Sequence, residues 1–191
     1  MLVPAEFSPG ELLPDDVLRR SLRSCGWNVK IYRGCRLVPP ERISIGDHSQ
    51  VDETVCIFAG EGVEIGRYVH FAIGSSITGG GACEIHDFVG IGAGTRLITG
   101  TELLENGLSN PTVPAELRAV SRGRIEIHAH ALVFTNCTIL PDVSIGEGAV
   151  VSAGSIVHHS LKPWAIYAGN PLVQVGVRSR ESVLEKAARL S

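Results

Sequence analysis

Residues 139–157 read ILPDVSIGEGAVVSAGSIV, and this stretch decides the fold. An aliphatic residue recurs in it at every sixth position, and the same ladder extends upstream to give Ile127, Val133, Ile139, Ile145, Val151 and Val157. A helix repeats every 3.6 residues and a strand every 2, so a period of six fits neither. It is typical of a chain that turns a corner every six residues, with three rungs in each triangular coil.

The same phase continues upstream in three shorter runs, which are Ile45, Val51, Ile57; Ile65, Phe71, Ile77; and Ile85, Ile91, Leu97. Two eight-residue steps separate these runs, and their extra residues fall at 60–62 (GEG) and 79–81 (GGG). Glycine suits such a widened corner because it adopts positive φ freely. The sequence therefore predicts an all-β solenoid of about five coils, with the aliphatic rungs inside and parallel strands stacked coil on coil.

One long excursion interrupts the ladder. The step from Leu97 to Ile127 is 30 residues, so residues 101–124 are expected to leave the coil as a loop, and loops of this length are usually functional. Short helices are expected near residues 14–22 and 179–190. We expect a single domain, divided into an N-terminal cap (1–40), the β-helix (41–177, with loop 101–124) and a C-terminal helix (178–191).

Composition excludes several classes of function. The 191 residues carry 17 Lys+Arg against 20 Asp+Glu, a net charge of −3, so no basic surface for nucleic acid is expected. No apolar run approaches the roughly 20 residues of a membrane span, and the first 16 residues lack the pattern of a signal peptide. These features predict no membrane insertion and a cytoplasmic location. The five cysteines form no CxxC pair and are expected to be reduced, mostly buried thiols.

The segment ILPDVSIGEGAVVSAGSIV, followed by WAIYAGNP, resembles the hexapeptide-repeat acyltransferases. This resemblance spans about residues 28–178 and implies a left-handed parallel β-helix, a homotrimer with active sites between subunits, and acetyl-CoA as co-substrate. VHFA, IHDFVGIGAG and SNPTVP are similar to the branch that acetylates sugars in bacterial surface-polysaccharide synthesis, including lipopolysaccharide. We therefore expect N-acetylation of a nucleotide-linked amino sugar, with O-acetylation of a sugar as the alternative.

Acyl transfer needs a base to take the proton of the acceptor, and histidine is the natural choice. In many relatives the catalytic histidine lies in a THP-type motif of the loop, where this chain has Asn110. We therefore look to the coil. His70 is the first candidate, because it should point outward beside the 79–81 corner. His130 and then His128 follow, and His48 is expected to be structural.

Other residues are assigned to the two substrates. The resemblance implies that the pantetheine arm of CoA follows coil-edge amides near residues 153–155, with Thr135 one coil earlier in register. The expected CoA-binding residues are Thr135, Ala153, Gly154, His158, His159, Lys162 and Arg178, the last two as candidates for the 3′-phosphate. Asn110, Glu102 and Glu105 of the loop are the candidates for binding the acceptor.

Two other classes of protein remain open. His86 and His128 each follow a first-face rung on neighbouring coils, so their side chains should lie close together. With His130 they superficially resemble the three histidines of the gamma-class carbonic anhydrases. The His-x4-His spacing of that family is absent, and we expect no metal. The second of these classes is a non-catalytic scaffold or binding protein, which would keep the β-helix after losing its base.

Overall fold

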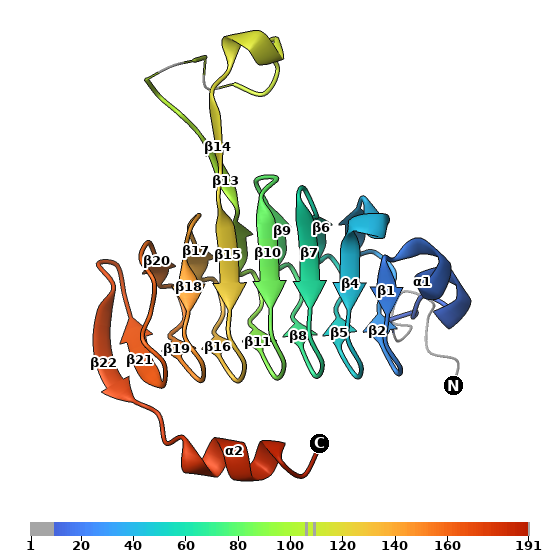
Figure 1. Cartoon of the computed structure of the whole chain (residues 1–191), viewed down its shortest axis with the longest axis vertical. Coiled ribbons are helices and arrows are strands. Elements are labelled where there is room, and N and C mark those ends of the chain that lie inside the picture. The colour runs from blue at the N-terminus through green and yellow to red at the C-terminus, as the bar shows by residue number, and fades with distance from the viewer. Residues whose placement is uncertain (1–9, 106, 109, 191) are drawn as a thin grey trace, which may run out of the picture.

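The computed structural model describes residues 10–105, 107–108 and 110–190, and it is a left-handed parallel β-helix (Figure 1). Three sheets run along it, one on each side of the triangular coil. The first face contains β1 (Ser24–Cys25), β4 (Ile43–Ile45), β7 (Gly62–Ile65), β10 (Ala82–Ile85), β15 (Arg124–Ile127) and β18 (Ser144–Ile145). This arrangement confirms the predicted fold class.

The other two sheets follow the same order. The second face contains β2 (Lys30–Ile31), β5 (Gln50–Val51), β8 (His70–Phe71), β11 (Gly90–Ile91), β16 (Leu132–Val133), β19 (Val150–Val151), β21 (Ala165–Ala168) and the antiparallel β22 (Val173–Val177). The third face contains β3 (Arg36–Val38), β6 (Cys56–Phe58), β9 (Ser76–Thr78), β12 (Arg96–Ile98), β17 (Thr138–Ile139) and β20 (Ile156–Val157).

The solenoid is longer than predicted, with about seven turns rather than five. Part of the expected N-terminal cap is a coil, because β1 to β3 stack on the next coil with Cys25 opposite Ile45, Ile31 opposite Val51 and Leu37 opposite Ile57. Cys25, Ile31 and Leu37 are themselves six residues apart. The prediction missed this coil because a cysteine occupies its first rung.

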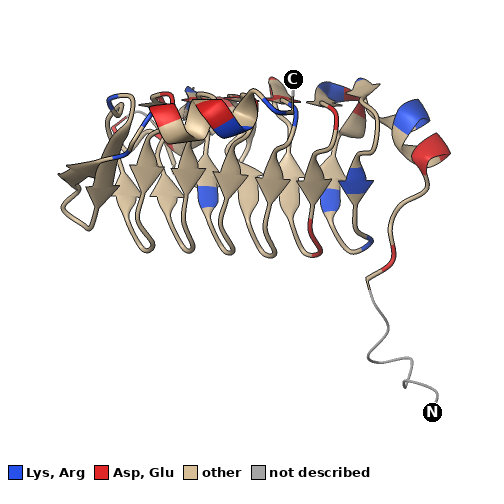
Figure 2. Cartoon of the chain, turned by 90° about the horizontal axis from the view of Figure 1, so that it is seen from below, with Lys and Arg blue, Asp and Glu red and all other residues tan. Residues whose placement is uncertain are grey.

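The interior consists of columns of aliphatic side chains. Ile57, Ile77, Leu97, Ile139 and Val157 stack along the third face and are fully buried. All five cysteines are free; Cys83 and Cys137 are buried, and the other three are half-buried. Burial raises the pKa of the Cys83 thiol to about 12. In Figure 2 the charged residues gather in the helices and along one long edge, and the strands in view are mostly uncharged.

Aromatic side chains contact one another along the corner between the first and second faces, stacked in every pair except Trp27–His48, which meets edge to face. We call this column the aromatic ladder, and its members are Trp27, His48, Tyr68, Phe88, His130 and Trp164. Neighbouring ring centroids are 4.6 to 6.3 Å apart. From His48 onward each member has a φ of 56 to 64°, a left-handed conformation that non-glycine residues seldom adopt. This column was not predicted from the sequence.

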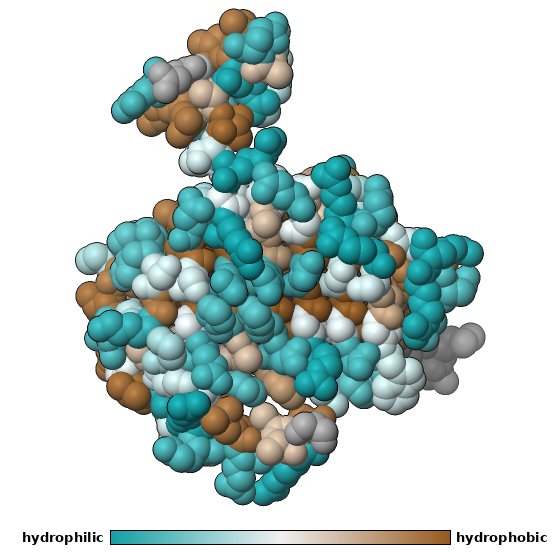
Figure 3. Space-filling view, viewed as in Figure 1, coloured by the Kyte–Doolittle hydropathy of each residue, from teal (hydrophilic) through white to brown (hydrophobic). Residues whose placement is uncertain are grey.

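The predicted excursion is confirmed and has a β-hairpin stem. Strands β13 (Gly100–Glu102) and β14 (Val120–Arg122) pair antiparallel, and the 3-10 helix η3 (Ala115–Leu117) lies near the tip. This arm projects beyond the solenoid (Figure 1), and Figure 3 shows apolar side chains on its end. Leu104 is 84% exposed and Leu108 56% exposed.

The predicted short helices are present at both ends of the chain. Helix α1 (Asp15–Ser21) precedes the first coil, and α2 (Glu181–Ala187) follows β22. A third short element, the 3-10 helix η2 (Pro40–Arg42), joins the first two coils. No helix in the described part of the chain is long and apolar enough to cross a membrane.

Ile139→Asp should unfold the coil, because it places an unpaired charge among fully buried rungs. We expect the free energy of unfolding to fall by about 3–5 kcal/mol, measured by urea denaturation. Thr138→Asp is the matched control, since Thr138 neighbours Ile139 in β17 and is only half-buried. It should cost less than about 1 kcal/mol. Equal losses in both variants would contradict the buried column.

Candidate active site

His70 and Asp52 form a hydrogen-bonded pair on the second face. Gln50 of β5 lies opposite His70 of β8, and Asp52 directly follows β5. His70 Nε2 lies 3.0 Å from Asp52 Oδ2, and Gln50 Nε2 donates to Asp52 Oδ1 at 2.8 Å. The side chain of His70 is 50% exposed, whereas Phe71 beside it is fully buried. His70 therefore points outward, as expected, and has a carboxylate partner.

The contact with Asp52 gives the imidazole of His70 a defined role for each nitrogen. An ionised carboxylate only accepts hydrogen bonds, so Nε2 carries the proton and Nδ1 keeps its lone pair. A histidine oriented in this way can accept a proton at Nδ1 while the carboxylate stabilises the resulting positive charge. Asp52 was not among the residues predicted from sequence. The available signal was its place one residue after the Val51 rung, on the coil preceding that of His70.

A hollow of about 180 Å³ adjoins His70. Gly90 lies opposite His70 on the next coil, and Leu132 lies opposite Gly90 on the coil after that. Because Gly90 has no side chain, room is left beside the imidazole. Leu132, whose side chain lies against Gly90, and Phe134 also line the hollow. A mostly apolar hollow with one histidine–carboxylate pair at its edge suits a thioester and an incoming nucleophile.

His130 lies elsewhere, in the aromatic ladder. Its ring is 5.1 Å from that of Phe88 and 6.3 Å from that of Trp164. Arg178 donates from Nη1 to the His130 carbonyl at 2.6 Å. Burial lowers the pKa of His130 below its usual value, and the charge of Arg178 lowers it further, whereas Glu147 opposes the shift. The structure therefore does not bring His130 to the hollow beside His70.

His128 lies at the end of the first face, next to His86. Their ring centroids are 5.1 Å apart, which confirms that the two side chains are close. His86 Nε2 is 3.2 Å from Glu126 Oε1, and His128 Nε2 is 3.1 Å from Ser144 Oγ. The hydrogen bond from His86 lowers the pKa of the Glu126 carboxyl. The three candidate bases are therefore separated: His70 lies on the second face, His130 at the first-to-second corner, and His128 at the end of the first face.

The predicted acceptor-binding residues lie on the arm. Asn110 Oδ1 accepts hydrogen bonds from the amide and hydroxyl of Thr112, at 3.0 and 2.8 Å. Glu102 forms an ion pair with Arg118 across the stem, and Glu105 is exposed. Ser109, which precedes Asn110 in the matching segment, lies outside the described residues. Within one chain the arm projects away from the second-face strands (Figure 1), so these residues do not meet His70.

The predicted CoA-binding residues separate into groups. Gly154 donates its amide to the Thr135 carbonyl at 2.9 Å, which confirms their register, and Ala153 is exposed beside them. His158 and His159 contact each other edge to face at the next corner.

Lys162 and Arg178 lie further along the chain. The Lys162 amide donates to the Tyr167 hydroxyl. The Arg178 guanidinium donates to the carbonyls of His130 and Gly148, and burial lowers its pKa. Arg178 thus lies against the first-to-second corner, apart from Thr135 and Gly154, which occupy the second-to-third corner.

Proteins of similar sequence are acyltransferases. The dTDP-4-amino-4,6-dideoxy-D-glucose acyltransferase of Escherichia coli is 32% identical over 173 residues, which are 87% of this chain and 90% of that protein. WbbJ of E. coli K12, named for O-acetyl transfer in lipopolysaccharide biosynthesis, is 31% identical over 69% of this chain and 66% of its own length. No protein-family model matches the chain.

Solved structures with a similar fold are also acyltransferases. A mutant of AntD, an N-acyltransferase from Bacillus cereus in complex with dTDP-4-amino-4,6-dideoxyglucose and coenzyme A, superposes with a TM-score of 0.88 at 30% identity. The match covers 95% of this chain and 97% of AntD. Fold and relatives together define a hexapeptide-repeat acyltransferase that uses an acyl-CoA. Within that class, the chain belongs to the family that acylates sugars and nucleotide-linked amino sugars.

His130 gives a pH-dependent contribution to stability. Its pKa is lowered in the folded state, so the unfolded chain binds the proton more readily. The free energy of unfolding should therefore decrease as pH falls from about 6.5, the unperturbed value, through the lowered folded-state pKa. His130→Phe, which keeps a stacked ring between Phe88 and Trp164, should lose this component.

Urea denaturation at several pH values, for the wild type and His130→Phe, measures the effect. Tyr68→Phe is the matched control, because it alters the same ladder without removing an imidazole. It should keep the wild-type decline. If the free energy of unfolding of His130→Phe fell with pH as much as that of the wild type, this pH dependence would not come from His130.

Proposed function

We propose that this protein transfers an acetyl group from acetyl-CoA to the amine of a nucleotide-linked amino sugar, with His70 as the general base. The observation that supports this most is the His70–Asp52 pair beside the hollow over Gly90. It supplies an oriented proton acceptor next to an open, mostly apolar surface. The similarity to an N-acyltransferase bound to a dTDP-linked amino sugar supports the acceptor class.

In the proposed reaction the neutral amine attacks the thioester carbonyl carbon. The new C–N bond forms as the carbonyl becomes an oxyanion, and His70 Nδ1 accepts a proton from the nitrogen. Asp52 stabilises the imidazolium through Nε2–H, at 3.0 Å. The C–S bond then breaks, CoA leaves as a thiolate, and the thiolate takes the proton from His70. The products are an amide and free CoA, and no other reactant is needed.

We also propose that the working unit is a homotrimer with active sites between subunits. The arm, which carries Asn110 and Glu105, projects away from the second-face strands that carry His70 (Figure 1). A neighbouring subunit that presents its arm to His70 would bring the parts together. We further propose that the protein acts in the cytoplasm. Its similarity to WbbJ supports a role in surface-polysaccharide synthesis.

The acceptor and donor are tested by CoA release. The purified protein, acetyl-CoA and a thiol reagent should give turnover with dTDP-linked amino sugars and little with the matched sugars that carry a hydroxyl in place of the amine. Turnover with hydroxyl acceptors alone would favour O-acetylation, the second candidate. The AntD complex with 3-hydroxybutyryl-CoA makes that donor the informative comparison with acetyl-CoA. No CoA release with any acceptor would favour a non-catalytic binding protein.

His70→Ala should lower kcat by roughly 10²–10⁴, because general-base catalysis contributes about that much. The KM for acetyl-CoA should stay close to wild type. Asp52→Asn should lower kcat less and change its pH dependence, since it weakens the hold on the imidazole without removing it. His48→Ala is the control from the neighbouring coil, and it should leave kcat nearly unchanged. Undiminished turnover in His70→Ala would remove His70 from the mechanism and move attention to His130 before His128.

A further inference from the structure

A second cluster of ligand-type side chains lies on the first face, away from His70. His86 follows β10, Glu126 lies within β15, and His128 follows β15. One ligand atom of each can be chosen so that all three lie within 4.8 Å of one another. We propose that this cluster binds one divalent transition-metal ion of the zinc class per chain, through the two imidazoles and the carboxylate.

The distances within the cluster are close to those of a metal site. Zinc binds imidazole nitrogen and carboxylate oxygen at about 2.0–2.2 Å, so tetrahedral ligand atoms lie roughly 3.3 Å apart. His86 Nε2 is 3.2 Å from Glu126 Oε1, and His128 Nε2 is 4.0 Å from Glu126 Oε2. Small rotations of the side chains would therefore close the site. Ser144 Oγ lies 3.1 Å from His128 Nε2, so a hydroxyl is near the fourth coordination position of the ion.

The register of the solenoid makes this arrangement rigid. Glu84 of β10 lies opposite Glu126 of β15, and His86 and His128 come two residues later on their respective coils. The stacked rings, 5.1 Å apart and inclined by only 12°, point the same way. Imidazole and carboxylate together suit zinc, whereas calcium and magnesium prefer oxygen ligands alone. The sequence pattern groups His86 and His128 with His130, but His130 lies in the aromatic ladder, and the third ligand-type side chain of the cluster is Glu126.

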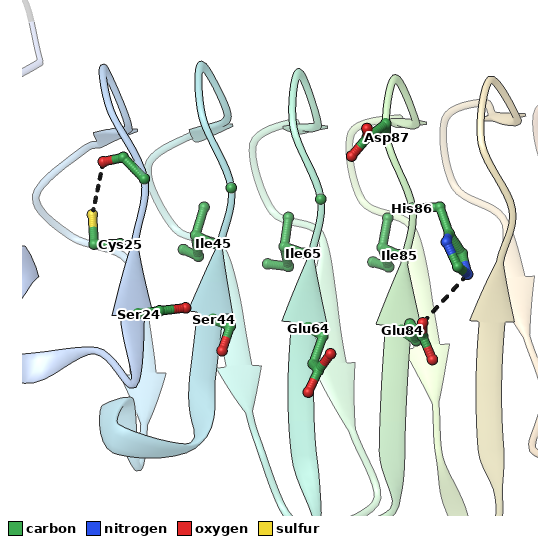
Figure 4. A pocket seen from close by; sticks show the side chains of 13 residues that line it. Ser24, Cys25, Ser44, Ile45, Glu64, Ile65, Glu84, Ile85, His86 and Asp87 are labelled. Carbon is green, nitrogen blue, oxygen red and sulfur yellow. Dashed lines mark hydrogen bonds and ion pairs between the residues drawn. The ribbon is translucent and has the colours of Figure 1, made fainter.

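The cluster is open to an approaching cation. A groove of about 420 Å³ runs along the first face and ends at His86 (Figure 4). Glu64, Glu84 and Asp87 line it, and each of these carboxylates is paired with an arginine, namely Arg23, Arg124 and Arg67 in that order. Glu84 lies 3.5 Å from His86 Nε2 and also pairs with Arg124, which places a further carboxylate at the edge of the site.

A metal ion here would join two coils at the point where the arm interrupts them. His86 belongs to the coil before the excursion, and Glu126 and His128 belong to the coil after it. Ligands from both sides would close the loop and stabilise the folded state, because an ion that binds only the native chain raises its stability. This role is independent of the proposed acetyl transfer.

Zinc binding to tag-free protein tests the proposal. After treatment with a chelator and desalting, titration calorimetry with ZnCl₂ should give one site per chain, and zinc should raise the melting temperature. Glu126→Gln and His86→Ala should each weaken zinc binding at least tenfold and abolish the thermal shift. The matched control is the double variant His158→Ala/His159→Ala, which removes an exposed histidine pair at another corner and should bind zinc like the wild type.

Two results would overturn the proposal. One is a wild-type protein that binds no zinc stoichiometrically, and the other is zinc binding lost in the His158/His159 variant but kept in Glu126→Gln. Circular dichroism of each variant checks that the coil is intact. Because the readouts are stoichiometry and melting temperature, a failure of this site is distinguishable from a failure of acetyl transfer.

Discussion

Hydrogen bonds between the backbones of successive coils determine every other arrangement in this protein. Gly46 donates to the Ile65 carbonyl at 2.8 Å, Gly66 to Ile85 at 2.7 Å, and His86 to Ile127 at 2.9 Å. A strand ladder of this kind leaves no freedom in register, because a slip of one residue would turn every rung from the interior to the surface. Equivalent positions on neighbouring coils must therefore stack. The core columns, the aromatic ladder, the His70–Asp52 pair and the His86–Glu126–His128 cluster are all consequences of that stacking.

Features that depend only on position within the coil were predictable from sequence. The six-residue period located the faces, the outward direction of His70, and the closeness of His86 and His128. Features that depend on which side chains contact each other between coils were not predictable in this way. Asp52 is not one of the aliphatic rungs, and its carboxylate reaches His70 through the choice of side-chain rotamer, which periodicity does not specify. The first coil was missed because Cys25 takes the place of an aliphatic rung.

The aromatic ladder shows how corner geometry and side-chain chemistry offset each other. A left-handed conformation costs a non-glycine residue about 1–2 kcal/mol, and Tyr68 and Phe88 both adopt it. A stacked aromatic pair contributes about 0.5–1.5 kcal/mol beyond the area that it buries. Each ring inside the column has two neighbours, so stacking recovers much of the cost. At the second-to-third corner the equivalent positions are mostly glycine or asparagine, such as Gly74, Gly94 and Asn136, which adopt this conformation at little cost.

The absence of a histidine at Asn110 is consistent with the acceptor that we propose. Asn110 uses its side-chain oxygen to hold Thr112, so this atom is engaged within the arm. A hydroxyl acceptor has a pKa far above neutrality and gains much from a base during attack. An amine in its neutral form attacks through its free lone pair and needs its proton removed only as the C–N bond forms. The base that we propose, His70, is oriented by Asp52 and half exposed, which meets that smaller demand. In this proposal the arm positions the sugar nucleotide instead of supplying the base.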